Sequence, residues 1–224
     1  MLKLNELNNW QDGINQVLCC DCLDLMKMMP DKCVDLVLTD PPYALNFGYD
    51  KYDDTRENLK LLIGNSIKDI LRIGKIVAIM PGITQVYLYP EADWIIACSW
   101  NTTGSFGKMG FSQWFPVLIY GKDIKGFGNV NGIIKSDLIS VSGGGGVGFM
   151  RNGDKDHPCP KPYNLIKKLI QRLSFDSNLI FDPFMGSWTT AKACQELHRN
   201  FIGAELSEKY CQIGEQRLAQ KPLF

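Results

Sequence analysis

The sequence predicts a single α/β domain built around an open, mostly parallel β-sheet. Seven short apolar runs are typical of buried strands, and amphipathic patterns of helical period separate several of them. The strand-like runs are residues 16–20, 34–39, 76–80, 94–98, 116–120, 179–182 and 201–205, and the helical patterns are residues 57–73, 164–173, 189–198 and 207–219. Such alternation indicates a parallel sheet, which binds ligands at the carboxyl ends of its strands.

Composition limits the class of protein. The chain has 224 residues, of which 45% are hydrophobic and 21% charged, as in one ordinary domain with a sizeable core. Residues 1–10 are polar and lack the apolar core of a secretory signal, and no run is apolar enough for a membrane span. Eight cysteines without a regular framework suit a reducing compartment. We therefore expect a cytoplasmic protein without membrane contact.

The first strand-like run, 16–20, ends before an acidic residue, Asp21. Cys19 and Cys22 have the spacing of a zinc-binding pair, but the chain has no second such pair at ligand spacing and only two histidines. We therefore expect small buried thiols here and no metal site.

The second run, 34–39, ends in Asp40-Pro41-Pro42-Tyr43. An exocyclic amine that attacks an electrophilic carbon needs acceptors for its two hydrogens, and its ring needs a flat surface to stack on. Asp40 can accept one hydrogen, the carbonyl of Pro41 or Pro42 can accept the other, and Tyr43 offers a stacking face. Taken alone, the same four residues also fit an ordinary Pro-Pro turn after a strand.

The central part of the chain is basic, although the whole chain has a net charge of zero. Between Lys122 and Arg172, basic residues outnumber acidic ones, as a phosphate-binding surface requires. An ordinary solvated face would show the same surplus. The glycine-rich stretch 142–148 within this part predicts a mobile loop.

A proline-rich segment, His157-Pro158-Cys159-Pro160-Lys161-Pro162, precedes the helical pattern 164–173. Its three prolines predict a rigid entry into the helix. His157 on its own would also fit a loop histidine bonded to the backbone.

The run 179–182 leads into Asp182-Pro183-Phe184-Met185-Gly186-Ser187, which predicts a strand, a tight glycine turn and a helix start. Such a turn lets a ligand approach the backbone. The run 201–205 ends in Glu205, 19 residues after Gly186. Dinucleotide-binding folds place an acid about twenty residues after their glycine turn, where it accepts the ribose hydroxyls.

In their order along the chain, these motifs resemble a beta-class DNA amino-methyltransferase, which uses S-adenosylmethionine to methylate adenine N6 or cytosine N4. The resemblance implies a single-domain, Rossmann-like, seven-stranded methyltransferase sheet with permuted motif order. It assigns the catalytic role of holding a flipped base to Asp40, Pro41, Pro42 and Tyr43. It assigns cofactor binding to Asp21, Cys22, His157, Lys161, Asp182, Phe184, Gly186, Ser187 and Glu205.

The resemblance also implies double-stranded DNA as the partner and a small inserted target-recognition region at about 123–156. This region is short, so a homodimer or a helper protein such as a restriction endonuclease fits the expectation. In the family, an aspartate at the head of the base-holding motif favours adenine N6, and cytosine N4 is the alternative.

Trp188 departs from the family pattern, because it stands where a second glycine usually lies. If this position needs a positive φ or close backbone approach, the indole would close the pocket and leave a DNA-binding relative without catalysis. If the position is only the first turn of a helix, the indole can point aside. We expect the second arrangement.

Overall fold

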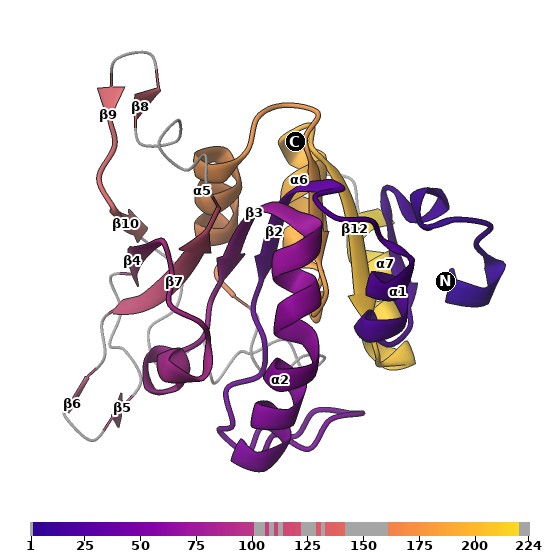
Figure 1. Ribbon diagram of the computed structural model, residues 1–224, viewed down its shortest axis with the longest axis horizontal. Helices are drawn as coiled ribbons and strands as arrows, with labels where there is room; N and C mark the ends of the chain where they lie inside the picture. Colours follow the sequence, from indigo (N-terminus) through magenta and orange to yellow (C-terminus); the bar gives the residue numbers. More distant parts are fainter. Residues whose placement is uncertain are drawn as a thin grey trace.

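The computed structural model describes residues 2–100, 106–107, 110–111, 114–121, 129–130, 133–141 and 161–219 (Figure 1). An eight-stranded sheet lies at its centre. In spatial order the strands are β1 (Gln16–Cys19), β12 (Asn200–Glu205), β11 (Leu179–Asp182), β2 (Val34–Thr39), β3 (Gly74–Ile79), β7 (Trp114–Tyr120), β4 (Trp94–Trp100) and β10 (Leu138–Val141). Neighbouring strands are parallel except at β7, which is antiparallel to both β3 and β4.

Helices cover both faces of the sheet. They are α1 (Cys22–Met28), α2 (Arg56–Ile73), α5 (Tyr163–Leu173), α6 (Thr189–Glu196) and α7 (Glu208–Ala219), with short 3-10 turns at η1 (Leu4–Glu6), η2 (Trp10–Gly13) and η3 (Ile83–Leu88). The structure also describes two small antiparallel pairs, β5 (Phe106–Gly107) with β6 (Gly110–Phe111) and β8 (Asn129–Val130) with β9 (Ile133–Ile134). Figure 1 views the sheet from the side of α1 and α2, with α2 in front of β2 and β3.

The central strands are buried on both faces, which explains their nearly continuous apolar sequences. Val37 of β2 packs in the core beneath α1 and α2, whereas Leu36 and Leu38 pack in the core beneath α5, α6 and α7. Side chains of one strand alternate between the two faces, so a single short strand packs against the helices on both sides of the sheet.

All seven predicted strands are present, and the α/β fold with a mostly parallel sheet is confirmed. The structure adds β10, an edge strand that pairs with β4 inside the predicted recognition region 123–156. It also adds the short helix α1, whose N-cap is Asp21. Both are brief elements next to glycine or cysteine runs, which carry little periodic signal.

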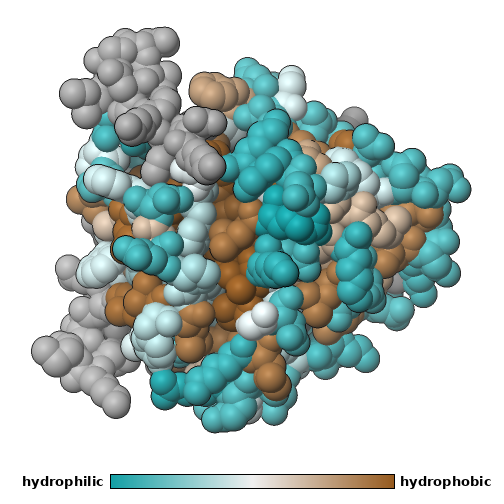
Figure 2. Space-filling view, in the orientation of Figure 1, coloured by the Kyte–Doolittle hydropathy of each residue, from teal (hydrophilic) through white to brown (hydrophobic). Residues whose placement is uncertain are grey.

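The outer surface is mixed in character. Figure 2 shows that hydrophilic side chains cover much of the visible face and that hydrophobic ones lie between them. Of the helices that the structure describes, none has the length and apolar character required to cross a bilayer.

The order of the strands reverses between β11 and β2. The chain runs from β2 to β3 on one side and from β11 to β12 on the other, and β2 and β11 pair directly in parallel. Loops that follow two such strands separate and leave a crevice at the carboxyl edge of the sheet, which is where ligands bind in this class of fold.

Candidate active site

A cleft of about 200 Å³ lies at this edge and is lined by residues from both halves of the chain. It brings together twelve of the residues that the sequence predicted, namely Asp21, Cys22, Asp40, Pro41, Pro42, Tyr43, Lys161, Asp182, Phe184, Gly186, Ser187 and Glu205. His157 lies outside the described residues. The segment Asp40-Pro41-Pro42-Tyr43 and the glycine turn therefore share one cavity.

Asp40 follows β2 and is engaged by two donors. The hydroxyl of Tyr43 donates to Asp40 Oδ1 at 2.5 Å, and Lys161 Nζ donates to Asp40 Oδ2 at 2.5 Å. The same ammonium lies 4.5 Å from the centroid of the Tyr43 ring. Lys161 was predicted to bind the cofactor; its ammonium contacts Asp40 and Tyr43 within the same cleft.

Asp182 ends β11 and ties three elements together. Its carboxylate accepts hydrogen bonds from Thr39 Oγ1 and Thr190 Oγ1, each at 2.8 Å, and from the backbone N–H of Phe184 at 3.1 Å. Burial raises the pKa of Asp182 to about 6, and these hydrogen bonds oppose the rise. Asp182 therefore fixes the shape of the loop after β11 relative to β2 and α6.

Glu205 ends β12 and faces the cleft. Its carboxylate accepts the backbone N–H groups of Gly186 and Ser207, each at 2.8 Å. Burial raises the pKa of Glu205 to about 7 despite these bonds. A carboxylate has about four acceptor sites, so Glu205 keeps capacity for a further donor from a ligand.

Asp21 and Cys22 form the wall contributed by α1. The Asp21 carboxylate caps the helix by accepting the N–H of Leu23 at 2.8 Å. Burial and the nearby Asp21 charge raise the pKa of the Cys22 thiol above its ordinary value, and they raise that of Cys20 to about 12. These cysteines are therefore protonated wall residues rather than nucleophiles.

Trp188 adopts a left-handed backbone conformation, with φ 61° and ψ 23°. This is the left-handed geometry that glycine favours, so the position has the positive φ named in the first of the two arrangements considered for Trp188. The indole nevertheless turns away from the cleft. It is 3% exposed, it is not among the cleft-lining residues, and it packs on Gly214 of α7, where a Cβ would lie 2.0 Å from Trp188 Cδ2.

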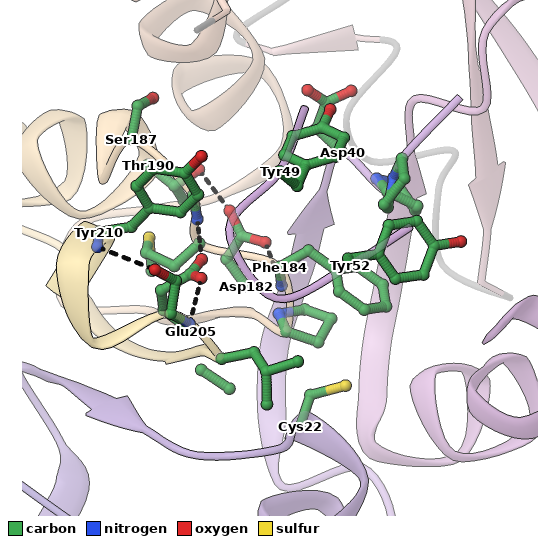
Figure 3. Close-up of a pocket in the computed structure, with 18 of the residues that line it drawn as sticks. Cys22, Asp40, Tyr49, Tyr52, Asp182, Phe184, Ser187, Thr190, Glu205 and Tyr210 are labelled. Atoms are coloured by element: carbon green, nitrogen blue, oxygen red, sulfur yellow. Dashed lines mark hydrogen bonds between the residues drawn. The ribbon is translucent and has the colours of Figure 1, made fainter. Parts of the chain in front are cut away.

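The sequence did not predict several residues that line the cleft. Tyr49 and Tyr52 come from the loop after the base-holding motif, and Tyr210 comes from α7. Figure 3 shows these tyrosine rings around the carboxylates of Asp182 and Glu205. The segment of Tyr49 and Tyr52 lacks helical or strand periodicity, and its only signal was the density of aromatic residues. Tyr210 lies within the predicted helical pattern 207–219, but that pattern does not show which of its residues face a cleft.

The loop that carries Tyr49 and Tyr52 is fastened at two points. The buried carboxylate of Asp54 accepts the backbone N–H groups of Ala44, Leu45 and Phe47. The hydroxyl of Ser207 donates to Asp50 Oδ2 at 2.7 Å, so the loop also reaches the segment between β12 and α7. These contacts give the loop a defined course along the cleft.

Among the described residues, no group of three or more His, Cys, Asp or Glu side chains is arranged to hold a metal ion. The chemistry that the cleft offers comes from hydrogen-bond acceptors and aromatic rings. Acceptors at Asp40 and Glu205, with several aromatic faces between them, suit a ligand that carries an amine, hydroxyls and flat rings.

Several known proteins are similar to this chain in sequence. Type II methyltransferase M.HpaI of Haemophilus parainfluenzae is 26% identical over 237 residues, which cover 91% of this chain and 74% of that protein. The putative methylase YubD of Escherichia coli (strain K12) is 26% identical over 214 residues, which cover 89% of this chain and 88% of that protein.

Solved structures show the same fold. The M1.HpyAVI–SAM complex has a TM-score of 0.66 at 21% identity and covers 92% of this chain and 99% of that chain. The PvuII DNA methyltransferase (cytosine-N4-specific) has a TM-score of 0.66 at 18% identity and covers 93% and 88%, respectively. Residues 92–216, more than half of the chain, match the family described as DNA methylase. The chain belongs to this N6/N4 class of DNA methylases.

Proposed function

We propose that this protein transfers a methyl group from S-adenosylmethionine to the exocyclic amine of a DNA base turned out of the duplex, with adenine N6 as the preferred target. The observation that carries the proposal is the shared cleft. Asp40 at the end of β2 and the Gly186 turn at the end of β11 line one cavity at the reversal point of the sheet.

The cofactor side of the cleft fits S-adenosylmethionine. Glu205 has acceptor capacity for ribose hydroxyls, the turn at Gly186 allows close approach, and Asp21 and Cys22 form a wall for the adenine. The indole of Trp188 lies outside the cavity and leaves this space open. When bound, the cofactor supplies an electrophilic methyl group on a sulfonium.

The base side of the cleft positions the amine. Asp40 accepts one amine hydrogen, a carbonyl of the Pro41-Pro42 pair accepts the other, and the base stacks on Tyr43. Holding the amine and the methyl group in line supplies most of the rate, because it removes the entropic cost of bringing them together. The target base must leave the duplex to reach this corner.

Adenine is preferred because Asp40 heads the motif, and cytosine N4 is the alternative. A catalytically inactive DNA-binding relative was suggested by Trp188. The orientation of its indole away from the cleft argues against that reading.

Two features of DNA recognition belong to the same proposal. We assign target reading to the region at about 123–156, and we propose that a homodimer or a restriction endonuclease partner complements it because the region is short. The type II name of M.HpaI supports a restriction–modification setting.

The direct test is transfer of tritiated methyl groups to unmethylated DNA, followed by enzymatic digestion and chromatography of the nucleosides. We expect the label in N6-methyladenine. Label in N4-methylcytosine would replace the adenine assignment, and absence of transfer by protein that binds S-adenosylmethionine would support the inactive relative. Modification-sensitive sequencing of DNA from expressing cells would then give the recognition sequence.

The raised pKa of Glu205 predicts a pH dependence of cofactor binding. The ionised carboxylate accepts ribose hydroxyls, and burial moves its pKa to about 7, so the accepting form is lost as the pH falls below that value. We expect the dissociation constant for S-adenosylmethionine to rise by about tenfold per pH unit below the pKa. Calorimetry across this range checks the prediction.

The matched control for this pH dependence is Glu205→Gln, which cannot ionise. This variant should bind more weakly than the wild type at high pH and with little pH dependence. A flat profile for the wild-type protein would show that Glu205 does not contact the ribose in its ionised form.

A further inference from the structure

Lys161 lies at the entry to α5 and reaches the corner formed by Asp40 and Tyr43. Its side chain is 10% exposed and that of Asp40 is 22% exposed, so water screens this ion pair poorly. Separating a shielded pair of charges costs more than separating a pair on the surface, because neither partner is fully resolvated.

The ammonium of Lys161 occupies the space that a stacked base needs. A base on Tyr43 would lie about 3.5–4 Å from the ring plane, and the ammonium lies 4.5 Å from the ring centroid. The backbone of Gly82 also packs on this ring, since a Cβ there would lie 3.4 Å from two ring atoms of Tyr43. A base that stacks beside the Asp40 carboxylate therefore competes with the ammonium of Lys161 for the ring of Tyr43.

The ammonium also makes the hydrogen bond that the amine of a base would make. It donates to Asp40 Oδ2 at 2.5 Å, while the hydroxyl of Tyr43 takes Oδ1. The ammonium of Lys161 thus makes the two contacts expected of a base: a hydrogen bond to the Asp40 carboxylate, as the amine would make, and a contact with the face of Tyr43, as the ring would make.

We propose that Lys161 is a positioning residue that holds the place of the target base in the base-free enzyme and is exchanged for the base amine when the base enters. The inference rests on the proposed function. The lysine keeps Asp40 and Tyr43 in the arrangement that the base requires. A nucleotide displaces it only by restoring both contacts, which disfavours bases that lack an exocyclic amine.

The experiment measures binding of 2′-deoxyadenosine and 2′-deoxycytidine by NMR titration. Saturating S-adenosylhomocysteine fills the cofactor site, so that the nucleosides report on the base site alone. The variants are Lys161→Ala, Lys161→Arg and the control Lys68→Ala, which removes an exposed lysine of α2 that is not among the residues lining the cleft.

We expect Lys161→Ala to bind at least one nucleoside about tenfold more tightly than the wild type, because the base no longer has to open an ion pair. Lys161→Arg and Lys68→Ala should bind as the wild type does. Added n-butylammonium, which resembles the lysine side chain, should reverse the gain in Lys161→Ala and leave the wild type unchanged. A residue with a purely structural role would not respond to this amine.

Unchanged or weaker nucleoside binding by folded Lys161→Ala would overturn the proposal, because lysine and base would then bind side by side. Absence of nucleoside binding by both proteins would overturn it as well. If Lys161→Ala fails to fold, Lys161→Met carries the same expectation. Failure of the proposed function is recognised separately, as absence of S-adenosylhomocysteine binding and of methyl transfer in the wild type.

Discussion

Asp40→Ala is expected to lower methyl transfer on the order of a thousandfold, as loss of a key positioning or proton-accepting group does, and to leave cofactor binding nearly unchanged. Asp40 is the carboxylate on the base side of the cleft, and Tyr43 and Lys161 both direct their donors at it. Removing it leaves the amine without its charged acceptor. Glu205 and the Gly186 turn, which we assign to the cofactor, stay intact.

Two measurements check this prediction: single-turnover transfer of labelled methyl groups to DNA and calorimetry with S-adenosylmethionine. Asp31→Ala is the matched control, because its carboxylate is 75% exposed and pairs with Arg72 away from the cleft. It should retain full activity. Substantial transfer by Asp40→Ala would remove Asp40 from the mechanism, and loss of cofactor binding would assign it to the other half of the site.

The sheet and its catalytic edge were predictable because they depend on local sequence. Buried strands such as β2 are apolar on both faces, and the polar residues that follow them, Asp40 after β2, Asp182 in β11 and Glu205 in β12, end on one edge of a parallel sheet. Once the strands are located, their carboxyl ends bring these residues together.

The contacts within the cleft were not predictable in this way, since they depend on how loops fold over the edge. Lys161 lies 121 positions after Asp40 in the sequence, and no periodic pattern predicts that the two side chains pair. Tyr49 and Tyr52 line the site because the Asp54 carboxylate accepts hydrogen bonds from three backbone N–H groups and so bends their loop. Such side-chain to backbone bonds compete with regular structure and leave no repeating signal.

Trp188→Gly is expected to destabilise the fold and to leave affinity for S-adenosylmethionine unchanged. Glycine would relieve about 1–2 kcal/mol of left-handed backbone strain, but losing a buried tryptophan costs about 3–5 kcal/mol. The net loss corresponds to a fall in melting temperature of several degrees, at about 2–4 °C per kcal/mol for a domain of this size. Calorimetry with the cofactor and thermal unfolding measure the two effects separately. Tighter cofactor binding would show that the indole obstructs the pocket.

Gly214→Ala tests the same contact from its other side. The added Cβ would lie within 2.2 Å of three indole atoms of Trp188. Because the indole is rigid, the turn before α6 and helix α7 must move apart. Overpacking of this kind costs about 1–3 kcal/mol or more. Gly64→Ala in α2 is the control, since nothing lies within 4 Å of its added Cβ, and it should be neutral or slightly stabilising.

The double variant Trp188→Gly with Gly214→Ala decides whether the two residues compensate each other. If the indole occupies the space that Gly214 leaves open, the alanine methyl no longer clashes once the indole is gone. The combined loss of unfolding free energy should then be smaller than the sum of the single losses. Additive losses would mean that the two residues act independently. A glycine in α7 would then not explain how tryptophan replaces the usual glycine of the cofactor turn without closing the cleft.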